Sequence, residues 1–400
     1  MRELKAAGKN AWAAGQTEER MKDYKKEIEQ LLDQVGEQKP DPVAEILERI
    51  NGSKYVCVFG LGTISHPIVA AIRNFTTLQI DFVCDNDPAK WGTYYHQNLK
   101  CLSPDELAGF GNDVAVLIAT QSYREIHEQL KKRGLNNIHV MTEYRLLNQA
   151  YLQRPENLEV IRRNAVRMVD LLSDEQSRRI LLVLISNWFR FSIEGAGYRG
   201  IFSRDQYYPS GIIQLRPDEV FVDAGAYNGD TLLEFVDRSG KEFKSIFAFE
   251  LDRNNFTDLE RACGQLDPAL RNKIALYNCG LWDEQTEISY KSGEAGSESS
   301  CMNVIGSPGE SGRAVRLSDI TGDAEVSFIK MDIEGSELKA LLGAEEVIRN
   351  QKPKLAVCVY HRPEHLWEIP SYLKSLVPEY RIFLRHHTNL EYETVCYAVP

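Results

Sequence analysis

Two acidic residues in the C-terminal half of the chain each stand at the end of a predicted strand. Asp223 follows the apolar run 220–222 and precedes a loop that contains Gly225 and Gly229, and Glu250 ends the apolar run 246–249. Glycine lets the backbone turn sharply and lets a ligand approach without a Cβ in the way. In open α/β sheets, ligands bind at the carboxyl ends of the strands. We therefore expect the two acids and the glycine loop to form a cofactor site.

The charge at this loop distinguishes between two classes of cofactor. The pyrophosphate of a dinucleotide binds helix N-terminal amides, and Asp223 and Asp230 would repel it. S-adenosylmethionine carries a sulfonium and an ammonium group, so acid at the loop suits it, and Glu250 can accept both ribose hydroxyls. The charges therefore favour S-adenosylmethionine. The alternative is that Asp223 only caps the helix after the loop.

A second group of polar residues stands where a methyl acceptor would bind. Asp332 ends the predicted strand 326–331, Glu334 lies two residues further on, and His361 follows the predicted strand 355–360. Methyl transfer from a sulfonium is an in-line displacement, and an alcohol acceptor must also lose its proton to a base. His361 is our first candidate for that base because imidazole titrates near neutrality, and Asp332 is the second.

Each of these residues also has another interpretation. His361 can be a strand-end histidine bonded to backbone, and Glu334 a first-turn acid in a helix that Ser336 caps. Asp332, Glu334 and His361 could together hold a divalent ion. Their spacing is not a recognised metal signature, so we expect no metal. Three further histidines are typical of surface positions: His365, His386 and His387.

Three segments of the C-terminal half resemble the FkbM family of methyltransferases: 221–231, 249–250 and the Asp-Ile-Glu-Gly block within 328–337. The resemblance covers roughly residues 200–400. It implies a seven-stranded class I methyltransferase fold, S-adenosylmethionine as donor and a hydroxyl oxygen as acceptor. Gln206–Tyr208 resembles the start of the family's domain and is expected to cover the cofactor. The expected cofactor residues are Asp223, Gly225, Ala226, Tyr227, Gly229, Asp230, Thr231, Glu250, Leu251, Asn278, Gly280, Leu281 and Asp332.

A second glycine loop lies in the N-terminal half. Gly60, Gly62 and Thr63 follow a predicted strand, as in a nucleotide-binding turn, but Ser65 stands where a third glycine usually does. Asp85, at the end of the next strand, could accept ribose hydroxyls. The unit resembles Rossmann domains that bind nucleotide-sugars. The alternatives are a degenerate fold kept for packing or dimerisation, and an NAD-dependent oxidoreductase, for which no hydride-transfer residue is identifiable.

The order of elements predicts an α/β protein with two Rossmann-like parallel-sheet domains. We place an N-terminal helical segment at 1–50, a Rossmann-like domain at 51–145, a helical connector at 146–215 and the methyltransferase domain at 216–400. The apolar stripe of the first segment fits docking on the following domain, which we favour, or pairing with another copy in a homodimer. The last two strands, near 381–384 and 394–399, predict an antiparallel hairpin. The Gly- and Ser-rich stretch 291–312 predicts a binding loop.

Composition limits the function classes. The chain has 43% hydrophobic residues and a formal net charge of −11, which disfavours nucleic acid and anionic lipid as partners. No membrane span or secretory signal is visible, and the scattered cysteines indicate reduced thiols in a cytoplasmic protein. We expect a methyltransferase that acts on a sugar or glycosylated metabolite. A non-catalytic cofactor-binding module is the remaining alternative.

Overall fold

The computed structural model describes most of the chain: residues 19–35, 42–62, 68–69, 72, 78–95, 98–120, 122–141, 151–152, 154–189, 196–290, 302–303 and 310–400. It divides into two compact units. One comprises Met1–Gln30, Arg162–Val183 and Tyr198–Pro400, and the other comprises Leu31–Ile161 and Leu184–Gly197. Among the described residues, no helix is both long and apolar enough to cross a membrane.

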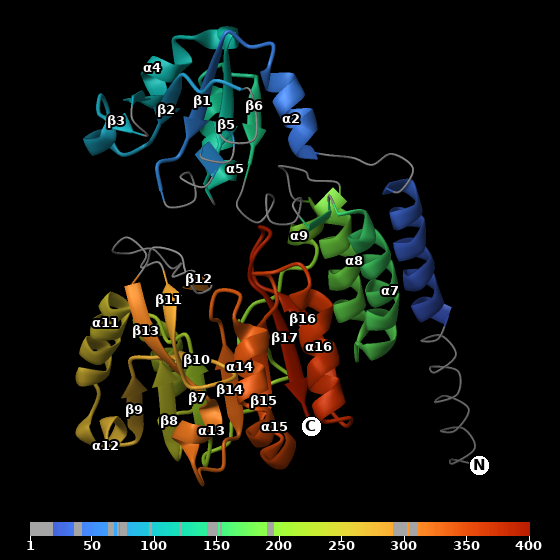
Figure 1. The fold of residues 1–400 in the computed structure, drawn as a ribbon, viewed down its shortest axis with the longest axis vertical. Coiled ribbons are helices and arrows are strands. Elements are labelled where there is room, and N and C mark those ends of the chain that lie inside the picture. The colour runs from blue at the N-terminus through green and yellow to red at the C-terminus, as the bar shows by residue number, and fades with distance from the viewer. Residues whose placement is uncertain are drawn as a thin grey trace. The chain divides into compact units, whose positions relative to one another are not determined.

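Seven strands form one sheet in the described part of the larger unit, in the order β16-β17-β15-β14-β7-β8-β9 (Figure 1). Six of them run in the same direction, whereas β17 runs antiparallel to its neighbours β15 and β16. The predicted methyltransferase fold and its terminal hairpin are confirmed. The strands are β7 (Val220–Ala224), β8 (Ser245–Phe249), β9 (Ile274–Tyr277), β14 (Phe328–Met331), β15 (Lys354–Cys358), β16 (Arg381–His386) and β17 (Thr394–Val399).

The sheet is buried because its central strands are continuous apolar runs, which need helices on both faces. Every residue of β7 and of β14 is buried. Their register places Lys330 beside Asp223 and Met331 beside Ala224, so the two strands end together. The helices of this sheet are α10 (Asp230–Arg238), α11 (Arg253–Gly264), α12 (Pro268–Arg271), α13 (Leu317–Thr321), α14 (Glu337–Gly343), α15 (Glu345–Gln351) and α16 (His365–Leu376).

A smaller sheet follows β9, in the order β10-β13-β11-β12. Its strands are β10 (Gly280–Leu281), β11 (Thr286–Tyr290), β12 (Met302–Asn303) and β13 (Glu310–Val315). Two parts of the stretch expected to be a loop, 302–303 and 310–312, are therefore strand. The remainder of that stretch, 291–301 and 304–309, lies outside the described residues.

The connector is helical, as predicted, and consists mainly of α7 (Pro155–Leu171) and α8 (Glu175–Phe189), followed by the short α9 (Ala196–Arg199). The turn between α7 and α8 lies along the edge strand β16. There the hydroxyls of Ser173 and Ser177 accept hydrogen bonds from the amides of Ile382 and Leu384. The helix at 19–35 docks on the chain through ion pairs between Arg20 and Glu175 and between Lys25 and Asp170.

Six strands form the sheet of the other unit over its described residues, in the order β3-β4-β2-β1-β5-β6, all parallel except the edge strand β3. Strands β3 and β4 were not expected from the sequence. The predicted helix at 64–74 lies largely outside the described residues. The elements are α2 (Pro42–Ile50), β1 (Tyr55–Phe59), β2 (Phe82–Cys84), η1 (Pro88–Lys90), β3 (Tyr94–Tyr95), β4 (Leu99–Leu102), α4 (Pro104–Ala108), η2 (Gly111–Asp113), β5 (Val114–Ile118), α5 (Tyr123–Lys132) and β6 (Ile138–Val140).

The cysteines of the described residues are buried and free, as expected for reduced thiols: Cys57, Cys84, Cys101, Cys263, Cys279, Cys358 and Cys396.

Candidate active site

The loop after β7 requires glycine at its first turn. Gly225 has φ +78°, and a Cβ at this position would lie 1.9 Å from the carbonyl oxygen of Asp332. Any side chain would therefore force β7 and β14 apart at their carboxyl ends. The amides of Gly225 and Ala226 both donate to the carbonyl oxygen of Phe249, at 3.0 and 2.9 Å. The loop is thus bonded to the end of β8 on one side and lies against the end of β14 on the other.

The amides that begin α10 are also bonded within the protein. The amide of Gly229 donates to the carbonyl oxygen of Ala226, that of Asp230 to Asn228 Oδ1, and that of Thr231 to Asp230 Oδ1. A pyrophosphate needs helix N-terminal amides that point at the ligand. The loop therefore disfavours a dinucleotide, as expected, although by its hydrogen bonding rather than by charge alone.

Asp223 is paired with a buried lysine, and its expected contact with the cofactor's amino end stays a prediction. Its side chain is fully buried, and Oδ1 lies 3.1 Å from Lys330 Nζ on the neighbouring strand. Burial raises the pKa of Asp223 to about 6, and Lys330 opposes that rise. The Lys330 ammonium also donates to the carbonyl oxygen of Gly225 at 2.6 Å. The Lys330 ammonium therefore balances the charge of Asp223 and is bonded to the backbone of the glycine loop.

Glu250 stands at the end of β8 with a fixed orientation. Its two carboxylate oxygens accept hydrogen bonds from the amides of Tyr227 and Asp252, at 2.9 and 2.8 Å. Burial nevertheless raises the pKa of Glu250 to about 7. The side-chain amide of Asn278 donates to the carbonyl oxygens of Glu250 and Leu251, which joins the ends of β8 and β9.

The remaining predicted cofactor residues lie near the carboxyl ends of the same strands. Leu251 packs near Gly280, and Leu281 is buried in the smaller sheet. Tyr227 has φ +47°, Asp230 is exposed and Thr231 is buried. The structure places these residues near the ends of β7, β8 and β9. Their contact with a cofactor stays a prediction.

Asp332, at the end of β14, is held on both carboxylate oxygens. Tyr207 Oη donates to Oδ2 at 2.7 Å, and His361 Nε2 lies 3.4 Å from Oδ1. Tyr207 is buried although it belongs to the segment before the sheet, and its ring lies 5.2 Å from Lys330 Nζ. The adjacent Gln206 donates to Glu393, which also accepts from Tyr360. The predicted covering segment thus reaches the acid of the acceptor side.

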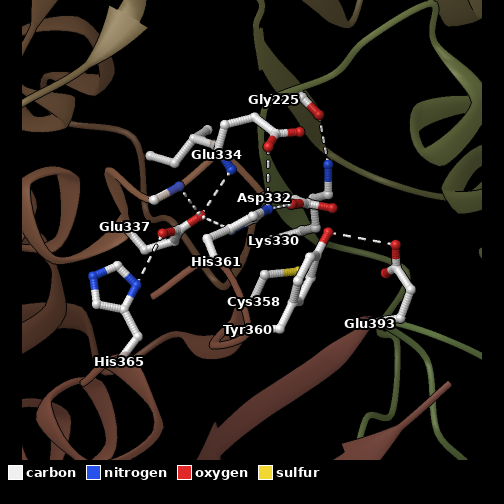
Figure 2. A network of polar contacts seen from close by, with 12 residues as sticks. Gly225, Lys330, Asp332, Glu334, Glu337, Cys358, Tyr360, His361, His365 and Glu393 are labelled. Atoms are coloured by element: carbon white, nitrogen blue, oxygen red, sulfur yellow. Dashed lines mark hydrogen bonds and ion pairs between the residues drawn. The ribbon is translucent and has the colours of Figure 1, made fainter. Parts of the chain in front are cut away.

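His361 is surrounded by carboxylates (Figure 2). Its Nδ1 lies 2.8 Å from Glu337 Oε1, and its Nε2 lies 3.5 Å from Glu334 Oε2. Burial opposes the charged form, yet Glu337 and Glu334 raise the pKa of His361 to about 10. The imidazole therefore carries its proton at neutral pH. The expectation that it titrates near neutrality is wrong, and with it the reason for ranking His361 above Asp332 as the base.

Glu337 and His365 are site residues that the sequence reasoning missed. Glu337 Oε1 accepts from the amides of Ile333 and Gly335, and Oε2 lies 3.2 Å from His365 Nδ1. Although burial disfavours the carboxylate, His361 and His365 hold the pKa of Glu337 well below its usual range. The helix starts at Glu337 and Ser336 makes no capping bond, so neither Ser336 nor Glu334 has the role expected for it.

The spacing of these residues in the sequence could have indicated Glu337 and His365 as site residues. Glu337 lies three residues after Glu334, and His365 lies four after His361, so each pair can share a face at a helix start. His365 and His386 are buried and His387 is half-buried, so none of the three is the surface residue expected.

The N-terminal glycine loop is closed by Asp85. Its Oδ2 accepts from the amide of Leu61 at 2.7 Å, and its Oδ1 accepts from the amide of Asp87 at 2.9 Å. Lys90 Nζ lies 3.2 Å from the same Oδ2. Asp85 thus supports the loop, and Gly60 adopts φ +106° there. Gly62 is described, and Thr63 lies outside the described residues. Nucleotide binding by this unit stays a prediction.

Two family models match the chain. Residues 223–390 match the methyltransferase FkbM domain, and residues 52–141 match a family described as C2185-like, N-terminal. No curated protein matches.

Solved structures give the same result for the fold. The crystal structure of methyltransferase FkbM from Methylobacillus flagellatus KT is 23% identical with a TM-score of 0.70, covering 94% of this chain and 99% of that one. The likeness shows that nearly the whole chain shares its fold.

Two further methyltransferase structures are much less similar. The methyltransferase domain of bacterial CtHen1-CN is 12% identical, with a TM-score of 0.28, and covers 46% of this chain and 91% of its own. A candidate rRNA methylase from Clostridium thermocellum is 14% identical, with a TM-score of 0.31. The match covers 47% of this chain and 90% of the methylase. These scores are too low to support a conclusion. The family model, the sheet order and the glycine loop agree, however, and residues 223–390 therefore form an FkbM methyltransferase domain, which makes this protein a methyltransferase.

Proposed function

We propose that the protein transfers the methyl group of S-adenosylmethionine to a hydroxyl oxygen of a sugar or glycosylated metabolite. The observation that carries this proposal is the position of Asp332. Its carboxylate is held by Tyr207 and His361, and its backbone lies against Gly225 in the glycine loop. A base is therefore held beside the loop at which the cofactor is expected.

The residues at the end of the sheet fit S-adenosylmethionine. This cofactor supplies an electrophilic methyl group on a sulfonium. Glu250 would hold its ribose, because the amides of Tyr227 and Asp252 already orient the carboxylate, and hydrogen bonds to an ionised acceptor are strong. The loop Gly225–Gly229 would lie under the cofactor. The surplus of carboxylates at this edge suits a donor that carries positive charge.

The acceptor side favours a neutral polyol. Asp332 and Glu334 each expose about one fifth of the side chain, 21% and 22%. Carboxylates accept hydrogen bonds from hydroxyl groups and repel phosphate or carboxylate groups on a substrate. Asp332 would take the proton of the hydroxyl, while the hydroxyl of Tyr207 keeps the carboxylate in place. The alignment of acceptor and donor supplies the larger part of the rate.

Calorimetry with S-adenosylhomocysteine tests the cofactor. The wild-type chain should bind it, NAD should not compete, and the Asp332→Asn variant should bind it almost as well. A panel of saccharides incubated with the methyl donor and analysed by mass spectrometry then tests the acceptor. A gain of one methyl group should occur with the wild type and fall ~10²-fold or more in Asp332→Asn. A folded wild-type chain that binds no S-adenosylhomocysteine would refute the proposal.

A further inference from the structure

Two short segments bring five possible metal-binding side chains together at the acceptor side. Asp332 and Glu334 lie between β14 and α14, and Glu337 is the first residue of α14. His361 lies between β15 and α16, and His365 is the first residue of α16 (Figure 2). The ligand atoms of Asp332, Glu337 and His361 all lie within 4.8 Å of one another.

The orientation of His361 is that of a metal ligand. Glu337 holds the ring through Nδ1 at 2.8 Å, and Glu337 is itself held by two backbone amides and faces His365. Histidines that bind metals characteristically give their second nitrogen to a carboxylate in this way. The arrangement aims Nε2 at the two partly exposed carboxylates.

The Nε2 atom of His361 is buried without a hydrogen-bond partner among the described residues. Only 4% of the side chain is exposed. Asp332 Oδ1 and Glu334 Oε2 lie 3.4 and 3.5 Å from it, beyond good hydrogen-bond lengths. Metal–ligand bonds of about 2.0–2.2 Å separate two neighbouring ligand atoms by roughly 3.0–3.5 Å. The observed spacings leave room for an ion bound by these three side chains.

We propose that His361 Nε2, Asp332 and Glu334 bind a divalent cation of the Mn²⁺ type, with Glu337 and His365 holding His361 in place. One imidazole and two carboxylates suit such an ion. On binding, the ion replaces the proton on Nε2. This site differs from the sequence expectation of no metal.

The inference rests on the proposed function for its role. The ion would lie on the acceptor side, beside the glycine loop, and would bind the acceptor's hydroxyl oxygen. It would lower the pKa of that hydroxyl. The O–H proton would pass to the carboxylate of Asp332, and the oxygen would then form its bond to the methyl carbon as the bond from carbon to sulfur breaks.

Manganese titration of the full chain, without any cofactor, tests the site. Loss of the electron paramagnetic resonance signal of free Mn²⁺ should report one ion per chain, confirmed by calorimetry, with Mg²⁺ and Zn²⁺ as competitors. Glu334→Gln should weaken binding at least 10-fold, and His361→Gln should do the same. Glu346→Gln is the matched control, since it removes one exposed carboxylate from α15 and should bind like the wild type.

The outcomes separate this site from the proposed function. If the folded wild type binds none of the three ions saturably, or if Glu334→Gln binds Mn²⁺ as tightly as Glu346→Gln does, the metal site is refuted. S-adenosylhomocysteine binding, measured on the same samples, reports the proposed function independently of the metal. Because Glu334 is partly exposed, its variant decides the question even if His361→Gln does not fold.

Discussion

Replacement of Lys330 by methionine tests the support of the glycine loop. The ammonium lies 3.1 Å from Asp223 Oδ1, and both side chains are buried, 3% and 0% exposed. Methionine keeps most of the volume but leaves a buried carboxylate without its cation. Breaking a buried pair on one side costs about 3–5 kcal/mol, so we expect a loss of that size in the free energy of unfolding at pH 7.5.

The pH dependence follows from the pKa of Asp223. Its folded pKa is raised to about 6 even with Lys330 present, above the ordinary value of about 3.9. The folded state therefore binds the proton more tightly, and stability increases as pH falls from 7 towards 4. Without Lys330 the carboxyl protonates more readily still. At pH 5 the loss should shrink to about 1–3 kcal/mol, the cost of a buried polar group without a partner.

Urea unfolding of the full chain, followed by circular dichroism at both pH values, measures this loss. Lys339→Met is the matched control, because Lys339 forms an exposed pair with Asp283, and such pairs contribute at most about 1 kcal/mol. The double variant Lys330→Met with Asp223→Asn should recover part of the stability. A Lys330→Met loss no larger than that of the control, or one that grows as the pH falls, would contradict the reasoning.

Three other predictions concern the same edge of the sheet. Glu250→Ala should weaken S-adenosylhomocysteine binding by about 1.5–3 kcal/mol, measured by calorimetry, because charge-assisted hydrogen bonds are lost; unchanged affinity would remove Glu250 from the site. The His361 imidazole of the metal-free chain should be protonated at pH 7.5 by NMR, since its folded pKa is about 10. Its raised pKa stabilises the fold fully below about pH 6.5, and this contribution disappears as pH rises through 10; a neutral ring at pH 7.5 would contradict the charge assignment. Gly225→Ala should lower the thermal midpoint of the chain and abolish cofactor binding, because the added Cβ meets backbone at 1.9 Å; a stable variant that still binds would show that the loop is not fixed.

The sheet could be predicted from the sequence because its strands are continuous apolar runs with acids at their ends. Asp223, Glu250 and Asp332 were placed on one edge by that rule alone. The partners of these acids could not be predicted, because strand register decides them. Nothing local in the sequence indicates that Lys330 lies beside Asp223, more than a hundred residues away. The rule therefore located the edge of the sheet but not the buried partners of its acids.

The histidines show a second limit. His361 was identified because it follows a strand, but its charge depends on Glu337, for which no role was predicted from the sequence. His365 was expected at the surface, but it is buried in α16, which packs against α14. Protonation state and burial come from tertiary neighbours, so spacing alone could not assign either.

The serine hydroxyls between α7 and α8 have a consequence for the smallest piece of the chain that can fold. Ser173 and Ser177 supply the acceptors for the outermost strand, and Arg385 pairs with Asp174 beside them. A truncation that begins near residue 216 would leave two strand amides bare and a buried guanidinium without its counter-ion. The unpaired edge strand β16 of such a fragment would favour aggregation. A fragment that folds on its own should therefore start before Ser173, well upstream of the segment that the family model matches.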